Sequence, residues 1–449
     1  MLARFLWDGL TGSDFGDLAP DDLRRLQEKR LRRLTERAYN GSKFWHEWFD
    51  RAGVKPEGVQ RLEDLSKLPL CSKSVLMNQP FEERRIGDPN RQVPAPTSGT
   101  TGPSMQACWS RSYNDLWASV VYFRMRYLSG IGLFDRMVCL SYTTPRKPGQ
   151  RKAPWSGLAV RRRKTALGVL EPVISRVGKG VYDRLYFTYG IEEVLPEIIK
   201  TRPSAVWGVS SLVRLLADAV AAGKVPGVRF KAVICGGDCL DDASRSYFES
   251  VFDCPVLGMY AANEVGFIAM ECKEVAGMHV MSDSMIFEVL RDGEPVAPGE
   301  MGEFVVTPLR NGAMPMIRYD LGDVVKTSDE KCPCGRKTPM IRSVEGRTED
   351  LLVVGDNRMV STREVGTILK SNSGLTCQLS QEEPTRFNLK VFSEDVPQAR
   401  GEVQSMVENL RRLLGDAATV AISMEGPRED KRKLRASTSA LKPSLNRTG

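Results

Sequence analysis

The sequence has no apolar run near the length that spans a bilayer, and it has only two histidines among 449 residues. A membrane-spanning helix needs about 20 consecutive apolar residues, so we expect no membrane partner. The first residues, MLARFLWDGL, lack the apolar core and cleavage site of a secretory signal, which favours a cytoplasmic protein. The ten cysteines are therefore expected to be thiols or metal ligands rather than disulfides.

Charge of one sign is also not concentrated enough to indicate nucleic-acid binding. The formal net charge of +8 suits anionic substrates but is diffuse. One stretch, residues 144–168, contains many Lys and Arg and no acidic residue, either as a solvated loop or as a patch for the phosphates of a large cosubstrate. It lacks the interleaved aromatics of single-strand binders and any recognised module, so we expect no nucleic-acid partner.

Hydrophobic periodicity predicts an α/β fold with substantial parallel sheet. A chain of this length is expected to form two or more domains. Residues 21–52 predict an amphipathic helix with a break at Asn40-Gly41, and a second helix is expected over 112–127. Short apolar strands then alternate with helices, which is typical of parallel sheets. The expected strands are 137–141, 204–209, 231–237 and 254–260, with a helix over 211–221.

The second half of the chain changes character. Residues 280–345 are rich in strand patterns with Gly and Pro turns, including a hairpin that turns at Asp292-Gly293. The last hundred residues predict a separate small α+β unit, with strands at 351–354 and 387–391 and a helix over 399–414. We place the boundary near Glu349-Asp350, giving domains 1–349 and 350–449.

A segment of small and hydroxylated residues, TSGTTGP, is the first candidate binding motif. It comprises Thr97, Ser98, Gly99, Thr100, Thr101, Gly102 and Pro103. Such a loop lets backbone N–H groups and hydroxyls converge on a phosphate. The Gly-Lys-Ser/Thr ending of a Walker P-loop is absent, and a plain surface loop remains the alternative.

Segments further along the chain fit nucleotide chemistry. Tyr260 and Glu264 follow a predicted strand, where a ring can stack on a base and a carboxylate can hold Mg²⁺. Asp323, after a glycine turn, suits hydrogen bonds from ribose hydroxyls. Arg347 supplies a cation for phosphate, and Asp350 follows at the domain boundary.

Cysteine and histidine spacing indicates a candidate metal site. Cys272 and His279 lie seven residues apart, and Cys332 and Cys334 belong to a Cys-Pro-Cys-Gly turn. Three thiolates and an imidazole suit tetrahedral structural zinc. Cys-X-Cys is shorter than the common Cys-X₂-Cys spacing, so ordinary thiols beside a hydrogen-bonded histidine are the alternative.

The order of these segments resembles the adenylate-forming superfamily of acyl-CoA synthetases, adenylation domains and luciferases, and most closely its phenylacetate-CoA ligase branch. The resemblance covers about residues 61–435. It rests on RLEDLSKLPLCSKSVLMNQP at 61–80 and on four later segments. These are VICGGDCL at 233–240, ANEVGFIAMEC at 262–272, PMIRYDLGD at 315–323, and CPCGR at 332–336 followed by EGRTEDLLVV. Branch members have cysteines at the places noted above, which favours zinc.

The resemblance implies an ATP-dependent acid–CoA ligase. A carboxylic acid, aromatic or otherwise hydrophobic, attacks the α-phosphate of ATP to form an acyl-adenylate; the C-terminal lid then rotates and coenzyme A displaces AMP. By this resemblance the loop Thr97–Gly102 binds the β- and γ-phosphates, and Gly236, Gly237 and Tyr260 border the adenine. Glu264 holds Mg²⁺, Asp323 the ribose, and Arg347 the ribose or phosphate. Lys431 acts in the first step only, and Asp350 is the hinge. A homodimer is suggested by analogy alone.

Departures from the branch pattern leave alternatives open. The usual Gly-Lys after the double threonine is Gly102-Pro103 here, and a Thr or Ser is replaced by Asn263, whose amide can still donate to phosphate. Asp430 precedes the expected catalytic lysine in place of glycine, so Lys433 is a rival to Lys431. The alternatives are transfer of the acyl group to an amine, hydroxyl or carrier-protein thiol, and a nucleotide-binding homologue without catalysis.

Overall fold

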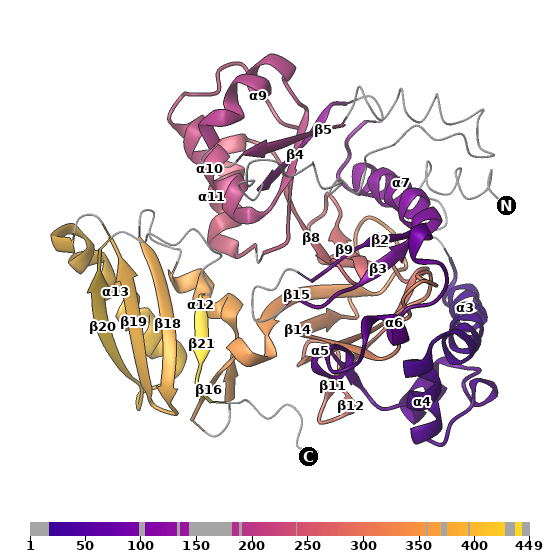
Figure 1. Ribbon diagram of the computed structural model, residues 1–449. Helices are drawn as coiled ribbons and strands as arrows, with labels where there is room; N and C mark the ends of the chain where they lie inside the picture. Colours follow the sequence, from indigo (N-terminus) through magenta and orange to yellow (C-terminus); the bar gives the residue numbers. More distant parts are fainter. Residues whose placement is uncertain are drawn as a thin grey trace, which may run out of the picture.

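The computed structural model describes most of the chain. The described residues are 18–97, 104–132, 135–142, 182–187, 191–238, 240–355, 358–369, 375–393, 396–426 and 436–441. The large sheet lies at the centre, helices lie at its upper end and right side, and the C-terminal unit lies to the left (Figure 1). The basic stretch 144–168 lies outside the described residues.

The first half of the large sheet is parallel. Its strand order is β5-β4-β6-β7-β8, with every neighbouring pair parallel. These elements are β4 (Met137–Tyr142), β5 (Tyr182–Phe187), β6 (Ala205–Gly208), β7 (Ala232–Gly236) and β8 (Val256–Ala262). The core strands are nearly continuous apolar runs because a parallel sheet is covered on both faces. Helices α9 (Leu195–Thr201), α10 (Ser210–Ala221) and α11 (Asp242–Phe252) accompany this part (Figure 1).

The second half of the sheet is mainly antiparallel and continues from β8 in the order β9-β10-β15-β14-β13-β11-β12. The strands are β9 (Gly266–Glu271), β10 (Met278–Val280), β11 (Met285–Arg291), β12 (Glu294–Pro295), β13 (Met301–Pro308), β14 (Tyr319–Ser328) and β15 (Met340–Arg347). The predicted turn at Asp292-Gly293 joins β11 to β12, and both residues have the positive φ of a hairpin turn. The long partner of β11 is β13, beyond the short β12.

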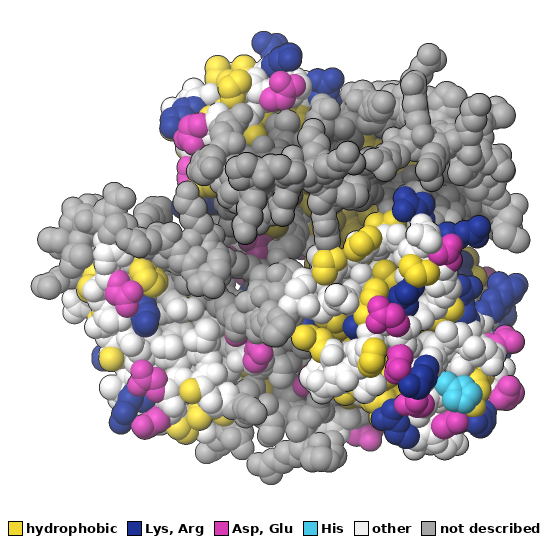
Figure 2. Space-filling model, in the orientation of Figure 1, with side chains coloured by type: hydrophobic (Ala, Val, Ile, Leu, Met, Phe, Trp, Pro, Cys, Tyr) yellow, Lys and Arg dark blue, Asp and Glu magenta, His cyan; other side chains and the backbone are white. Residues whose placement is uncertain are grey.

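The N-terminal helices pack beside this sheet. Residues Pro20–Gly41 form α3 and Lys43–Arg51 form α4, with a break at Ser42, one residue after the predicted Asn40-Gly41 break. The Ser42 side chain accepts a hydrogen bond from Trp45 N and so caps α4. Figure 2 shows acidic and basic side chains intermixed over the described part of this face. The ion pairs Arg24–Glu63 and Lys43–Glu83 join these helices to the short elements that follow them.

A short hairpin precedes the helix predicted over 112–127. Strands β2 (Gln92–Pro94) and β3 (Cys108–Ser110) are antiparallel, and α7 (Arg111–Leu128) follows β3 directly. The segment before the hairpin contains short elements only. These are η1 (Pro56–Gly58), η2 (Leu62–Lys67), β1 (Cys71–Ser72), α5 (Lys73–Met77), α6 (Phe81–Arg84) and η3 (Pro89–Arg91); a further short helix, η4 (Ile191–Glu193), precedes α9.

The C-terminal part forms its own sheet and apolar core. Strand order is β20-β19-β18-β21, with a separate β16-β17 pair. The elements are η5 (Thr348–Asp350), β16 (Leu352–Val354), β17 (Arg358–Val360), α12 (Thr362–Leu369), β18 (Thr376–Glu383), β19 (Arg386–Phe392), α13 (Val396–Leu414), β20 (Thr419–Glu425) and β21 (Ser437–Ser439). Side chains such as Leu379, Phe387 and Leu410 are fully buried within this unit.

The predicted α/β class is confirmed by this arrangement of a large, partly parallel sheet with a small α+β unit. Among the described helices, none is long and apolar enough to cross a membrane.

Candidate functional site

Two glycines end the central strand β7, next to the end of β8. Gly237 has φ of 87°, a conformation that side-chain-bearing residues rarely adopt. A Cβ on Gly236 would lie 2.8 Å from Met259 Cε and 3.0 Å from the Met259 carbonyl oxygen, so this strand end accepts only glycine without a shift. Ligands bind at the carboxyl ends of strands in open α/β sheets, and Tyr260 lies on β8 beside these glycines.

Tyr260, Asp323 and Arg347 form one hydrogen-bonded cluster. Asp323 and Arg347 are partners across the antiparallel β14–β15 pair, so their side chains start as neighbours. Arg347 Nε lies 3.0 Å from Asp323 Oδ1, and the Tyr260 hydroxyl donates to Asp323 Oδ2 at 2.6 Å. Three predicted site residues that are separate in sequence therefore lie together around the Asp323 carboxylate.

Electrostatics fix the proton positions in this cluster. Burial, together with the negative charge of Asp323, holds the pKa of the Tyr260 hydroxyl well above its usual range. The hydroxyl therefore stays protonated and acts as a donor, while Arg347 faces the same carboxylate as a cation. An ionised Asp323 with both neighbours in place is held in one orientation.

Glu264 lies on the turn that joins β8 to β9. Its side chain is buried, with 9% exposure, and Tyr319 donates its hydroxyl to Glu264 Oε1 at 3.3 Å. Burial raises the pKa of this carboxyl, and the hydrogen bond from Tyr319 opposes that rise. Sequence reasoning did not single out Tyr319, although it lies within the segment PMIRYDLGD.

The segment TSGTTGP, residues 97–103, is called the Ser/Thr/Gly segment below. It begins at Thr97, where the hydrogen-bonded pairing that continues the β2–β3 hairpin ends. Thr97 is buried: its backbone N–H donates to the Met105 carbonyl at 3.0 Å, and its Oγ1 accepts from Met105 N at 2.8 Å. Thr97 therefore closes the base of the segment. The other predicted phosphate contacts, Ser98 to Gly102, lie outside the described residues.

Asn263, one residue before Glu264, makes a contact that the sequence did not indicate. Its side-chain amide donates to the Pro96 carbonyl at 3.1 Å, and its own carbonyl accepts from the Trp109 indole N–H at 3.0 Å. The turn with Glu264 is therefore joined to the hairpin with Thr97.

Asp350, the predicted hinge, is buried at the start of the C-terminal unit. Its backbone carbonyl accepts from the Ser437 hydroxyl at 3.0 Å, so β21 lies beside it. A second link joins the C-terminal unit to α11 through an Arg363–Asp242 ion pair of 2.6 Å. The predicted lysine, Lys431, and its rival, Lys433, lie outside the described residues.

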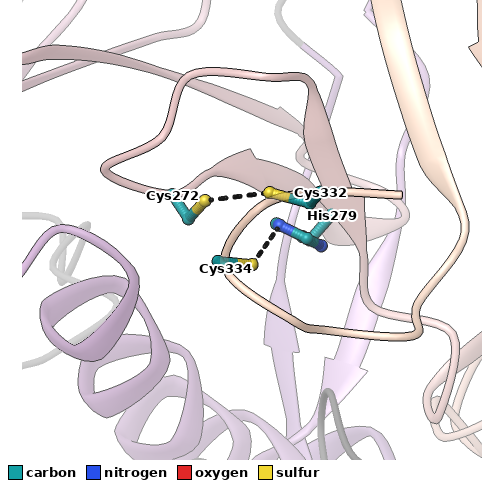
Figure 3. Close-up of side chains that lie close together, drawn as sticks. All are labelled: Cys272, His279, Cys332 and Cys334. Carbon is teal, nitrogen blue, oxygen red and sulfur yellow. Dashed lines mark hydrogen bonds between the residues drawn. The ribbon is translucent and has the colours of Figure 1, made fainter. Parts of the chain in front are cut away.

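The four predicted metal ligands come together as a second site. The ligand atoms of Cys272, His279, Cys332 and Cys334 all lie within 4.8 Å of one another. Figure 3 shows them converging from the end of β9, from β10 and from the turn before β15. Cys272 Sγ lies 3.6 Å from Cys332 Sγ, and Cys334 Sγ lies 3.4 Å from His279 Nε2.

We call Cys272, His279, Cys332 and Cys334 the thiol cluster. A neighbouring side chain, Thr338, orients the His279 ring within it. His279 Nδ1 lies 2.9 Å from Thr338 Oγ1, and a proton donated there leaves the Nε2 lone pair facing the sulfurs. Burial lowers the pKa of the His279 imidazole to about 4, so the ring is neutral near pH 7. Burial also raises the pKa of the Cys332 thiol to about 12. No pattern in the sequence pointed to Thr338.

Curated proteins similar to this chain include several that share one name. A scan against models of known protein families finds no match. A phenylacetate-coenzyme A ligase of Thermus thermophilus is 25% identical over 93% of this chain and 96% of its own length. The enzyme of the same name in Escherichia coli is 27% identical over 74% of this chain and 73% of its own length.

Solved structures show the same fold. A 2-hydroxyisobutyryl-CoA ligase in its postadenylation state, with an acyl-AMP bound, superposes with a TM-score of 0.76 at 18% identity, covering 95% of this chain and 91% of that one. The same ligase in its thioesterification state, with coenzyme A, gives 0.63 at 19% identity over 94% and 90% of the two chains. Both superpositions extend over nearly the whole chain, so the two proteins share one architecture.

The solved structures share the fold of this chain, and the curated relatives make the chain similar to enzymes of the adenylate-forming superfamily. Within that superfamily the chain is phenylacetate-CoA ligase-like, as its motifs predicted, and the expected class of AMP-forming acid–CoA ligase is confirmed. ATP and coenzyme A are the cosubstrates of that class.

Proposed function

We propose that this chain activates an aromatic or other hydrophobic carboxylic acid with ATP and passes the acyl group to coenzyme A. The observation that carries the proposal is the Tyr260–Asp323–Arg347 cluster, with the Glu264 turn directly after the same strand, β8. The relatives named phenylacetate-coenzyme A ligase support an aromatic acid.

Each side chain has a task in the first half-reaction. Asp323 accepts from ribose hydroxyls, Arg347 neutralises ribose-side or phosphate charge, and Tyr260 with Gly236 and Gly237 borders the adenine. Glu264 offers a carboxylate for Mg²⁺, which would neutralise charge on the triphosphate when bound. Thr97 to Gly102 hold the β- and γ-phosphates. Positioning and charge neutralisation provide most of the catalysis in phosphoryl chemistry.

The C-terminal unit is proposed to act as the lid, with residues 1–349 and 350–449 as the two domains and Asp350 as the hinge. Two observations support this. Residues of 352–420 share a core of their own, and the described segment after the lysines, β21, lies beside Asp350. Lys431 then reaches the carboxylate and α-phosphate in the adenylating orientation only.

The thiol cluster is proposed to hold one structural Zn²⁺. Four ligands at about 2.0–2.3 Å from a shared ion lie roughly 3.4–3.8 Å from one another. The Cys272–Cys332 and Cys334–His279 pairs, at 3.6 Å and 3.4 Å, have that size, and the four ligand atoms all lie within 4.8 Å of one another. Four protein ligands fill a tetrahedron and leave no position for water, so the ion would tie β9 and β10 to the turn before β15 rather than take part in catalysis.

A cytoplasmic setting and a homodimer complete the proposal. The nine described cysteines are free thiols, which favours a reducing compartment. The homodimer rests on family analogy, and sedimentation analysis of the purified chain tests it.

The function is tested by ATP–pyrophosphate exchange over a panel of carboxylic acids, followed by product analysis with and without coenzyme A. Acid-dependent exchange with thioester formation supports the proposal. Exchange with transfer only to an amine, hydroxyl or carrier protein would change the acceptor, and nucleotide binding without exchange over a broad panel would contradict an enzyme.

A further inference from the structure

The β2–β3 hairpin continues its ladder to the edge of the Ser/Thr/Gly segment. Beyond β2 and β3, Ala95 N donates to the Ala107 carbonyl at 2.8 Å, and Thr97 N donates to the Met105 carbonyl at 3.0 Å. Thr97 is the first residue of the Ser/Thr/Gly segment. The contacts that hold this hairpin in place therefore also fix the position of Thr97.

Within the described part of the chain, three side chains from outside the hairpin donate to its backbone carbonyls. Asn311 Nδ2 donates to Cys108 O at 2.9 Å, Arg84 Nη1 to Gln106 O at 3.1 Å, and Asn263 Nδ2 to Pro96 O at 3.1 Å. The Asn263 contact is the one next to Thr97. It is also the one made by a neighbour of Glu264, the proposed Mg²⁺ ligand.

The turn that contains Asn263 and Glu264 is also bound by the other strand of the hairpin, β3. The Trp109 indole N–H on β3 donates to the Asn263 carbonyl at 3.0 Å. The Trp109 ring also packs on Gly266, where an added Cβ would lie 3.1 Å from the ring atom Cη2. The side chain of Asn263 and its backbone thus bind the hairpin through both of its strands, which limits independent movement of the hairpin and the Glu264 turn.

We propose that Asn263 is a positioning residue that holds Pro96, at the start of the Ser/Thr/Gly segment, in register with Glu264, rather than a direct ligand of ATP phosphates. The inference rests on the proposed function and deepens it. A serine or threonine hydroxyl lies about one bond nearer the backbone than the Asn amide nitrogen, so from the same backbone position it would reach less far toward the Pro96 carbonyl, which the amide contacts at 3.1 Å. On this proposal the amide supplies the reach that a hydroxyl lacks.

The first test is hydrogen exchange of the nucleotide-free protein over residues 92–110. Losing one hydrogen bond changes local opening by about three- to tenfold. We expect Asn263→Ala and Asn263→Ser to speed exchange at Thr97 and Met105 by this factor, and Trp109→Phe to do the same. Trp45→Phe is the matched control, because the Trp45 indole also donates to a backbone carbonyl, that of Pro315, at 3.1 Å.

The second test is the ATP dependence of pyrophosphate exchange in the same variants. We expect the KM for ATP to rise about three- to tenfold in both Asn263 variants, with the Ala and Ser forms equal. The Asn263→Ala and Trp109→Phe effects should be less than additive in the double variant, because both act on one link.

Two results would overturn the inference: unchanged hydrogen exchange in Asn263→Ala together with weaker ATP binding, or an Asn263→Ser variant that behaves like the wild type. Either would show that the Asn263–Pro96 link does not set ATP affinity, and the first would make the side chain a direct phosphate donor. Because the hydrogen-exchange test needs no catalysis, it stays separate from the proposed function: an inactive wild type with the expected exchange pattern would reject the enzyme and keep the link.

Discussion

The thiol cluster and the Tyr260–Asp323–Arg347 cluster differ in how completely the described residues build them. The thiol cluster has four candidate ligands within 4.8 Å of one another, all from the strand-rich half of the large sheet. The Tyr260–Asp323–Arg347 cluster is in place, but its expected partners are spread from residue 97 to the C-terminal unit. The thiol cluster is thus complete within the described residues, whereas the other cluster depends on residues elsewhere in the chain.

This difference teaches what each site is suited to do. If the thiol cluster holds zinc as proposed, its four ligands fill a tetrahedron and leave no position for a substrate, so its contribution would be to stability. The Tyr260–Asp323–Arg347 cluster, if the C-terminal unit acts as the proposed lid, could exchange partners between the two half-reactions. Variants of the two sites should therefore separate chemistry from folding.

The largest expected effect belongs to Lys431, on the C-terminal unit. Lys431→Ala should lower adenylation by at least about 10²–10³-fold, the cost of removing one preorganised electrostatic contact, and should largely spare thioester formation from supplied acyl-adenylate. Both half-reactions are measured separately, with Lys433→Ala as the matched control. Equal loss of both half-reactions would contradict an exchange of partners, and a defect confined to Lys433→Ala would move the role to that lysine.

Glu264→Gln should come next, because it removes the charge proposed to hold Mg²⁺ while keeping the size of the side chain. Adenylation should fall by about 10²-fold. Burial raises the pKa of Glu264, so the folded state holds the proton of this carboxyl more tightly than the unfolded state does. The stability of the wild type therefore falls as the pH rises from the unfolded-state pKa to the folded-state pKa of Glu264. The variant should therefore melt no lower than the wild type at neutral pH. An unchanged rate and unchanged Mg²⁺ dependence would remove Glu264 from the site.

Cys334→Ser tests the thiol cluster by removing one of its four candidate ligands. Zinc content and melting temperature should fall together, the latter by about 5–10 °C if an ion worth several kcal/mol is lost. Cys377→Ser, a buried thiol in the C-terminal unit, makes the same chemical change away from the cluster and is the control. Elemental analysis decides the matter: substantially less than one zinc per wild-type chain would count against the site.

The smallest expected effect is a pH shift. Tyr319 donates to Glu264 and so lowers the pKa of that carboxyl. Tyr319→Phe should move the acid limb of the Mg²⁺-dependent rate toward higher pH, because the carboxylate then forms only at a higher pH. Tyr247→Phe is the matched control, since its hydroxyl also donates to a carboxylate, Asp218, at 2.7 Å. A shift of equal size in both variants would show a general effect rather than one at Glu264.

Sequence patterns predicted the elements whose apolar runs are strong. The expected strand at 231–237 is β7 at Ala232–Gly236, and the expected helix over 211–221 is α10 at Ser210–Ala221. The strand at 387–391 is β19, but its neighbour β18 was not predicted. In β18 the residues TCQLSQEE bury only every second side chain over a short stretch, and pairing with β19 rather than propensity makes it a strand.

The sites divide in the same way. Spacing of thiols and histidine, together with the family resemblance, singled out the four residues that the structure brings together, because few residue types serve as zinc ligands. The contact of Asn263 with Pro96 spans 167 residues, and neither residue type indicates the other. Tyr319 and Thr338 were missed for the same reason. Only tertiary packing places the Tyr319 hydroxyl beside Glu264 and the Thr338 hydroxyl beside His279.

The most direct measurement of the contrast is ATP–pyrophosphate exchange per folded molecule in Glu264→Gln and Cys334→Ser, compared at a temperature where both remain folded. We predict that exchange falls about 10²-fold in Glu264→Gln and stays within about twofold of wild type in Cys334→Ser. A fully folded Cys334→Ser protein that has lost exchange, or a Glu264→Gln protein that retains it, would contradict the assignment of chemistry to the proposed nucleotide site around Glu264 and of stability to the thiol cluster.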